Sequence, residues 1–232
     1  MGKITGNQLL VKALKEEGVD TVFGYPGACV IDIFDELYKD DTIDVILPRH
    51  EQGLIHAADG YARATGKVGV CLATSGPGAT NLVTGIATAN YDSVPLVCFT
   101  GQVALPLIGN DTFQEVDIVG VTRNVAKFVI VVRNRADLGR IIKEAFYIAR
   151  TGKPGPVLID LPKDVMGTFG SEEYPDSVNI RGYKPNTKVH HGQVMRAMKA
   201  LHKSKKPLFL IGGGTKIAGA HKEMTRLAEI LK

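Results

Sequence analysis

Residues 68–100 have the sequence VGVCLATSGPGATNLVTGIATANYDSVPLVCFT, which contains two apolar runs separated by a glycine-rich turn and a helical pattern. The apolar runs, Val68–Ala73 and Val94–Thr100, lack polar alternation, which is typical of strands buried on both faces of a parallel sheet. Asn81–Ala89 between them predicts a helix. A strand, a helix and a second strand at this spacing predict a βαβ unit and therefore an α/β fold.

The same alternation continues on both sides of this unit. Thr5 and Gln8 form a capping-box pattern before an amphipathic helix that ends near Gly18. Further strands are predicted at 21–23, 44–47, 128–132 and 157–161, and further helices at 30–38, 52–65 and 136–150. Strands and helices in this order predict a doubly wound parallel sheet.

The alternation stops after residue 161 and resumes near residue 189. The intervening segment is rich in Gly, Pro, Ser and Asp, and Pro175 and Pro185 would interrupt a helix there. We therefore expect a first domain at 1–165, a linker at 166–188, and the start of a second α/β domain at 189–232. The elements expected in the second domain are a helix at 192–202, a strand at 207–211, a turn at 212–214 and a helix at 218–231. Roughly 40 residues are too few to enclose a typical sheet, so we expect this second domain to be truncated.

Composition indicates a globular protein that acts on neither membranes nor nucleic acid. Hydrophobic residues make up 44% and charged residues 22%, and no apolar run approaches the ~20 residues of a membrane helix. The net charge is +4, and its one basic cluster, Lys203, Lys205 and Lys206, is interpreted as a solvated helix end. Because the first residues show no signal or transit pattern, a cytoplasmic location is expected. The cysteines have no metal-ligand spacing and are interpreted as mostly buried, reduced thiols: Cys29, Cys71 and Cys98.

Four polar loops follow predicted strands. In a doubly wound fold they lie at the carboxyl edge of the sheet, where such proteins bind ligands. The loops are 24–28 (GYPGA), 48–52 (PRHEQ), 74–81 (TSGPGATN) and 100–115 (TGQVALPLIGNDTFQE).

The glycines of the 74–81 loop alone have two interpretations. Gly76 and Gly78 between a strand and a helix are compatible with a dinucleotide site. However, Asn81 replaces the third glycine of that fingerprint, no acid for a ribose follows Thr100, and Pro77 removes a backbone donor. We reject the dinucleotide interpretation, and a simple tight turn remains the structural alternative.

Glu51 is the candidate for chemistry in the 48–52 loop. It follows a strand and opens a helix whose inner face carries Leu54, Ile55, Ala58 and Ala62. In isolation, a carboxylate at a helix start is more often a cap or a helix-dipole partner than a catalytic group.

The order of the motifs along the chain favours a catalytic role for Glu51 over a cap or helix-dipole role. They are Gly24-Tyr-Pro-Gly27, Arg49-His-Glu-Gln52, Ala57-Ala-Asp-Gly-Tyr-Ala-Arg63, Thr74-Ser-Gly-Pro-Gly-Ala-Thr-Asn81 and Phe113-Gln-Glu115. In this order they resemble the pyrimidine-binding domain of thiamine-diphosphate enzymes. The resemblance covers essentially the whole chain and is closest to acetolactate (acetohydroxyacid) synthase large subunits. That family's segments also appear as Thr151-Gly-Lys-Pro-Gly-Pro156 and Asp160-Leu-Pro-Lys-Asp164.

The resemblance implies a role for each matching residue. Glu51 would bond the aminopyrimidine ring of thiamine diphosphate and so activate the cofactor for catalysis. Phe113 and Lys163 would lie near the substrate entrance. The residues lining the pyrimidine and substrate side would be Tyr25, Pro77, Asn81 and Gln114. The implied reaction is decarboxylation of pyruvate and condensation with a second 2-keto acid, giving acetolactate or acetohydroxybutyrate for branched-chain amino-acid biosynthesis.

The resemblance also implies FAD and Mg²⁺. Lys153 matches a basic FAD contact, and Gly212, Gly213 and Gly214 match a glycine turn near the flavin nucleotide; a loop-end charge and a plain β-turn are the alternatives. The family's Gly-Asp-Gly motif, which holds Mg²⁺ and diphosphate, does not occur in the chain. We therefore expect a carboxy-terminal domain to supply the metal site and this fragment alone to be inactive. The resemblance further implies a homodimer or tetramer and a small regulatory subunit as a possible partner.

Several positions depart from the family pattern. Ala28 and Cys29 replace a common Gly-Ala, Ala104 stands where proline is common, and Phe128 stands where histidine is common. These changes lie on the substrate side, so they affect substrate choice more than reaction class. The alternatives are another thiamine-diphosphate 2-keto-acid enzyme (pyruvate oxidase, glyoxylate carboligase or a decarboxylase) or a non-catalytic cofactor-binding module.

Overall fold

The structure is a computed structural model that describes residues 2–231. The chain divides into two compact units, and the boundary between them along the sequence lies at the Lys184–Pro185 bond. Each unit is described by itself.

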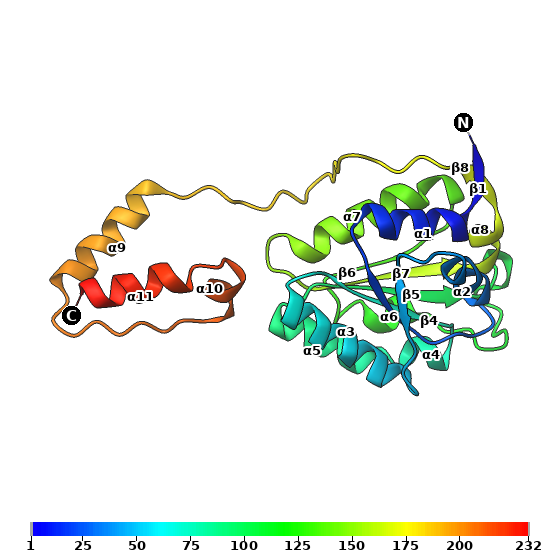
Figure 1. Cartoon of the computed structure of the whole chain (residues 1–232), viewed down its shortest axis with the longest axis horizontal. Coiled ribbons are helices and arrows are strands. Elements are labelled where there is room, and N and C mark those ends of the chain that lie inside the picture. Colours follow the sequence, from blue (N-terminus) through cyan, green and yellow to red (C-terminus); the bar gives the residue numbers. More distant parts are fainter. Residues whose placement is uncertain (1, 232) are drawn as a thin grey trace. The chain divides into compact units, whose positions relative to one another are not determined.

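A six-stranded parallel sheet forms the centre of the first unit (Figure 1). Its strands are β2 (Thr21–Gly24), β3 (Asp44–Ile46), β4 (Gly69–Ala73), β5 (Leu96–Gln102), β6 (Phe128–Val131) and β7 (Pro156–Pro162). The spatial order is β3-β2-β4-β5-β7-β6, and every neighbouring pair is parallel. The prediction of a doubly wound parallel sheet is therefore confirmed.

Helices cover both faces of this sheet (Figure 1). One face carries α1 (Gly6–Glu16), α2 (Ile31–Tyr38) and α7 (Leu138–Arg150), and the other carries α3 (Glu51–Thr65), α5 (Val83–Asp92) and α6 (Ile118–Thr122). Each face has its own buried apolar cluster, the first around Phe99 and Phe146 and the second around Ile55 and Ile86. Since burying one such side chain contributes ~1.5–3 kcal/mol, these clusters dominate the stability of the unit.

Local signals in the sequence locate most helix ends correctly. The predicted capping box of α1 is present, because Gln8 N donates to Thr5 Oγ1 (3.2 Å) and Thr5 N donates to Gln8 Oε1 (3.0 Å). Gly66 ends α3 in the left-handed conformation. The helix predicted from Asn81 begins later, at Val83, because the turn before it forms a short helix of its own, α4 (Pro77–Thr80).

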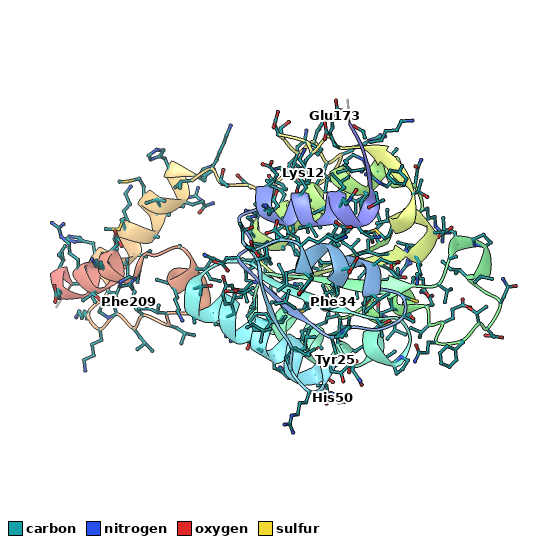
Figure 2. The ribbon with its side chains drawn as sticks, turned by 45° about the vertical axis from the view of Figure 1, so that its right-hand side comes forward. Lys12, Tyr25, Phe34, His50, Glu173 and Phe209 are labelled. Carbon is teal, nitrogen blue, oxygen red and sulfur yellow. The ribbon has the colours of Figure 1, made fainter. Side chains whose placement is uncertain are left out.

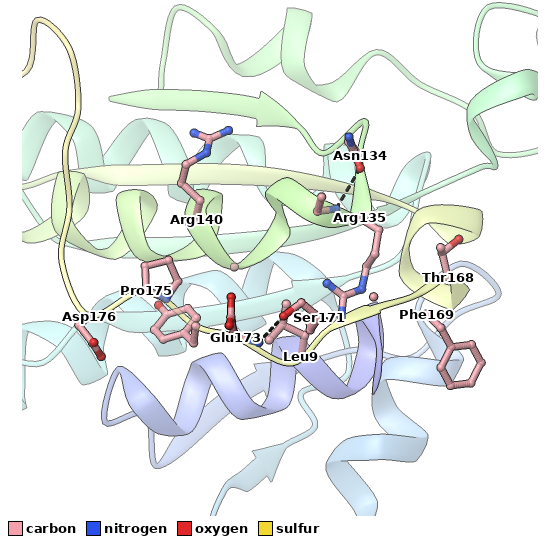
Figure 3. Close-up of a pocket in the computed structure, with 14 residues that line it drawn as sticks. Leu9, Asn134, Arg135, Arg140, Thr168, Phe169, Ser171, Glu173, Pro175 and Asp176 are labelled. Carbon is pink, nitrogen blue, oxygen red and sulfur yellow. Dashed lines mark hydrogen bonds between the residues drawn. The ribbon is translucent and has the colours of Figure 1, made fainter. Parts of the chain in front are cut away.

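A two-stranded antiparallel ribbon was not predicted. It pairs β1 (Lys3–Thr5) with β8 (Phe169–Ser171), and each strand has only three residues, too few to show a period. Arg135 fastens this ribbon to the domain: its Nη2 donates to Ile4 O (3.0 Å), Thr5 O (3.2 Å) and Ser171 O (3.2 Å). Burial lowers the pKa of this guanidinium. Arg135 and Phe169 also line a hollow of about 790 Å³ beside this ribbon, and the side chains around it are drawn in Figure 3.

Residues 166–184, expected as linker, pack on the first unit. Tyr174, Ile180 and Tyr183 lie against its apolar cluster. Tyr183 Oη donates to Thr151 O (2.9 Å) and Tyr174 Oη donates to Glu17 Oε1 (3.0 Å). These aromatic side chains, spaced along a segment without secondary-structure periodicity, attach it to the domain.

The second unit contains α9 (His191–Lys203), α10 (Gly213–Ile217) and α11 (His221–Ile230). Within residues 185–231 the segment 207–211 forms no strand, although a strand was predicted there. Leu208 and Leu210 are 94% and 99% exposed, so the apolar run has no neighbouring strand or core to pack on. No helix in residues 2–231 has the length and apolar character required to cross a membrane.

Candidate active site

Glu51 is the first residue of α3, directly after the loop that follows β3. The preceding residue, His50, caps the helix, since its Nδ1 accepts a hydrogen bond from Gln52 N (3.1 Å). The cap is therefore made by His50, and the Glu51 carboxylate is free to face the site. Its side chain is half-buried.

Asn81 orients the Glu51 carboxylate. Asn81 Nδ2 donates to Glu51 Oε2 over 2.9 Å, which joins the loop after β3 to the turn after β4. Glu51 Oε1 accepts no hydrogen bond from residues 2–231. One carboxylate oxygen is held in place and the other remains available to a ligand.

The turn of residues 74–81 approaches this carboxylate closely because of its glycines. Gly76 has φ +59°, a region that favours glycine, and a methyl group there would lie 2.7 Å from Gln114 O. A methyl group at Gly78 would lie 2.8 Å from Thr74 Cγ2 and 3.4 Å from Glu51 Oε1. Pro77 is the first residue of α4, a position where no helical hydrogen bond requires its missing N–H. The turn is thus shaped to bring its backbone against Glu51 and Gln114.

Tyr25 and the loop after β2 lie beside the same turn. Tyr25 N donates to Leu72 O (2.9 Å), and its ring packs on the second apolar cluster. Cys29 N donates to Thr74 Oγ1 (3.4 Å), and Ser75 Oγ donates to Cys29 Sγ (3.2 Å). In Figure 2, Tyr25 and His50 lie at the same edge of the domain. Tyr25, Glu51, Pro77 and Asn81 are therefore brought to one edge of the sheet.

The loop of residues 103–116 closes this edge from the β5 side. Gln114 has φ +58°, and its carbonyl lies against Gly76. Phe113 is 85% exposed. The loop's tip is held by Glu115, whose carboxylate accepts hydrogen bonds from Gly109 N and Thr112 N, and these bonds lower its pKa. Gln114 thus meets the glycine turn, and Phe113 projects into solvent.

Lys163 follows β7 and connects to the loop after β2. Its Nζ donates to Ala28 O (2.9 Å) and lies 3.9 Å from Asp32 Oδ2. The side chain is exposed and held by one backbone carbonyl, so it can change partners at low cost.

Asp160 belongs to a cluster of buried polar side chains for which no role was predicted. It is 1% exposed, and its carboxylate accepts hydrogen bonds from Thr100 Oγ1 (2.7 Å) and Gln102 Nε2 (3.0 Å). Burial raises the pKa of Asp160 to about 7 against these two bonds, and the charge of Asp117 adds to the rise. The signal in the sequence was one polar residue in each of two apolar strand runs, Thr100 at the end of the first and Asp160 within the second.

The residues expected at FAD lie in different units. Lys153 is in the first unit, is exposed, and its Nζ donates to Asn90 O. Gly212, Gly213 and Gly214 are in the second unit, where Gly212 precedes α10. Residues 2–231 contain no group of three or more His, Cys, Asp or Glu side chains arranged for a metal ion.

A doubly wound domain with a carboxylate at a helix start, a glycine turn and aromatic and amide side chains at one sheet edge defines the class of cofactor-binding α/β domains. Residues 4–121 match the family described as "Thiamine pyrophosphate enzyme, N-terminal TPP binding domain". The chain belongs to this family.

Curated relatives extend the similarity over the whole chain. The acetolactate synthase isozyme 3 large subunit of Escherichia coli (strain K12) is 49% identical over 100% of this chain and 41% of its own length. The acetolactate synthase large subunit of Haemophilus influenzae is 48% identical over the same shares, and the acetolactate synthase of Arthrospira platensis is 49% identical over 98% of the chain and 40% of its own length. The chain thus spans about two-fifths of the length of these relatives.

Proposed function

We propose that the full-length protein carrying this sequence is an acetolactate synthase. It decarboxylates pyruvate and joins the two-carbon product to a second 2-keto acid, forming acetolactate or acetohydroxybutyrate for branched-chain amino-acid biosynthesis. The names of the relatives and the family of the first unit support this proposal.

The observation that carries the proposal is the Glu51–Asn81 pair. Asn81 holds Oε2 of the carboxylate, while Oε1 is free among residues 2–231 and borders the space that Gly78 leaves open. A half-buried acceptor with one free oxygen fits a ring nitrogen of an aminopyrimidine, so these residues are suited to thiamine diphosphate. Once bound, thiamine diphosphate supplies the carbon nucleophile and the electron sink needed for loss of carbon dioxide from a 2-keto acid.

Each residue at this edge has a defined task in the proposal. Glu51 holds a proton at the pyrimidine nitrogen, and Asn81 fixes the carboxylate for that purpose. Tyr25, Pro77 and Gln114 line the pyrimidine and substrate side. Two exposed residues meet the substrate: Phe113 presents an apolar surface, and Lys163 presents an ammonium that can pair with a keto-acid carboxylate.

The remaining cofactors and partners are part of the same proposal. Residues 1–165 would form the pyrimidine-binding domain and residues from 189 onward the start of a central FAD domain. Lys153 and Gly212–Gly214 would contact FAD, and Mg²⁺ would be held by a further domain with the diphosphate. We also expect a homodimer or tetramer in the cytoplasm and a regulatory small subunit as a candidate partner.

Product analysis of the full-length protein with thiamine diphosphate, Mg²⁺, FAD, phosphate and oxygen, given pyruvate or, in a parallel assay, glyoxylate, tests the proposal. Acetolactate is the expected product. Acetaldehyde would identify a decarboxylase, acetyl phosphate a pyruvate oxidase, and tartronate semialdehyde from glyoxylate a carboligase of different specificity. Absence of any product under these conditions would favour a non-catalytic cofactor-binding module.

A further inference from the structure

The loop of residues 103–116 is held at both ends by one side chain. Gln102 Oε1 accepts a hydrogen bond from Val103 N (2.9 Å), at the start of the loop. Gln102 Nε2 donates to Val116 O (2.9 Å), at its end. The amide of Gln102 is 3% exposed, so these bonds do not compete with bulk water. A single buried amide therefore closes the loop that carries Phe113 and Gln114.

Asp160 is a third partner of that amide. Asp160 Oδ2 accepts a hydrogen bond from Gln102 Nε2 (3.0 Å), and Thr100 Oγ1 holds the other carboxylate oxygen (2.7 Å). If the amide were flipped, its carbonyl would face Val116 O and the Asp160 carboxyl group, and its N–H groups would face Val103 N, so both bonds to the loop backbone would be lost. Asp160 thus reinforces the amide orientation that Val103 N and Val116 O already favour, without contacting the loop itself.

We infer that Asp160 and Gln102 are positioning residues: the Asp160–Gln102 pair closes the loop of residues 103–116 and thereby sets where Phe113 and Gln114 meet the 2-keto acid. The inference rests on the proposed function for the identity of the substrate. The mechanical part, closure of the loop, rests on the contacts alone. Within the loop, the carbonyl of Gln114 lies against Gly76, so opening the loop at Gln102 alters the approach to the glycine turn.

Replacing Gln102 by Leu in the full-length protein tests this inference. The variant keeps the apolar part of the side chain and removes every bond to Val103, Val116 and Asp160. Hydrogen–deuterium exchange of peptides covering 103–116 should become at least tenfold faster. The KM for pyruvate should rise at least tenfold, while kcat changes less, because the loop presents substrate-facing residues and does not carry Glu51.

Gln8→Leu is the matched control, since the same substitution breaks the capping box of α1 and touches no residue of the site. It should lower the melting temperature and leave both loop exchange and KM unchanged. A Gln102→Leu variant that behaves in the same way would overturn the inference and leave Gln102 with a purely structural role.

Two substitutions at Asp160 distinguish the effect of its hydrogen bonds from the effect of its side-chain size. Asp160→Asn can accept from Gln102 through its carbonyl and donate to the Thr100 hydroxyl, so it should keep the KM and loop exchange of the wild type. Asp160→Leu removes one partner of the amide but leaves Val103 N and Val116 O, so loop exchange and KM should change in the same direction as in Gln102→Leu and to a smaller extent. Equal impairment in Asn and Leu variants would contradict the inference. If the wild type makes no acetolactate, the proposed function fails, while loop exchange in these variants still decides whether the pair closes the loop.

Discussion

The two sides of the candidate site are built differently. The turn side, consisting of Tyr25, Glu51 and residues 74–81, is shaped by backbone: Gly76 and Gly78 occupy positions where a methyl group would collide with Gln114 or Thr74. The loop side, consisting of residues 103–116 and Lys163, is shaped by side-chain hydrogen bonds: Gln102 and Lys163 donate to backbone carbonyls, and Glu115 accepts from backbone N–H groups.

This difference determines which residues of each side can be replaced. On the turn side, a larger residue at Gly78 would press on both Thr74 and Glu51, so the carboxylate geometry permits few substitutions. On the loop side, Phe113 is 85% exposed and Lys163 holds a single carbonyl, so both can be replaced without disturbing a core. Under the proposed function, the side that would activate the cofactor therefore tolerates few substitutions, and the side that would meet the substrate tolerates more. Of the departures from the family pattern, Ala28 and Ala104 lie in loops on the loop side, whereas Cys29 bonds to Thr74 and Ser75 of the turn side. Phe128, expected on the substrate side, begins β6 at the opposite end of the sheet.

The largest expected effect concerns the turn side. Glu51→Gln keeps the size of the side chain but removes the charge that stabilises a proton on the pyrimidine nitrogen. Turnover should fall on the order of a hundredfold or more, roughly 3 kcal/mol in the barrier, with cofactor binding largely retained. The measurement is C2 proton exchange of bound thiamine diphosphate together with the melting temperature.

Glu223→Gln is the control for helix-dipole effects, since Glu223 is an acid in the first turn of α11. Normal C2 exchange in Glu51→Gln, accompanied by a lower melting temperature, would show that Glu51 serves only the helix. The turn side would then contain no residue that activates the cofactor.

The second effect concerns pH and the loop side. Asp160 has a pKa of about 7 in the folded protein, above its ordinary value of 3.8, because burial penalises the charged form. The folded state therefore binds this proton more tightly than the unfolded state. The loss of folding stability caused by ionising Asp160 grows as pH rises from about 4 to 7. Asp160→Asn carries no such penalty, so its stability advantage over the wild type should grow by roughly 2 kcal/mol between pH 5.5 and 8. Melting temperatures of the full-length protein at both pH values measure this, and an advantage independent of pH would show that Asp160 is charged throughout.

A smaller effect is expected from the partner of Glu51. Asn81→Ala removes the donor to Glu51 Oε2 and frees the carboxylate to rotate. A hydrogen bond to a charged group contributes ~1.5–3 kcal/mol, so turnover should fall about tenfold. Thr80→Ala is the control: its hydroxyl donates to Pro77 O and does not reach Glu51. Unchanged turnover in Asn81→Ala would show that Glu51 is oriented without it, and the turn side would then depend on backbone alone.

The smallest expected effect concerns Lys153, which belongs to neither the turn side nor the loop side. Lys153→Glu places a negative charge where the proposal puts a phosphate of FAD, and an exposed charge reversal should weaken flavin binding roughly fivefold. The full-length protein should purify yellow, and the fluorescence of released flavin gives the affinity. Unchanged affinity would remove Lys153 from the FAD site, whereas a change in the KM for pyruvate would extend the loop side to include it.

Several features could be predicted because their signals are local. The strand runs, the capping box of Thr5 and Gln8 and the strand-to-helix loops all follow from residue types within a few positions of one another. The ribbon of β1 and β8 could not be predicted, since three-residue strands show no period and their fastening residue, Arg135, is about 130 residues from Ile4 and Thr5. The strand predicted at 207–211 is absent because an apolar run becomes a strand only beside another strand.

The sequence by itself determined the doubly wound fold class, the family and the candidacy of Glu51, because periodicity and motif order are properties of the chain read in one direction. Only the tertiary structure decided which of those residues meet. Asn81 reaches Glu51 across 30 positions, and Gln102 reaches Asp160 across 58, because the strand order β3-β2-β4-β5-β7-β6 sets which loops are neighbours. That order results from packing helices on both faces of the sheet, which is a property of the whole domain and of no single segment.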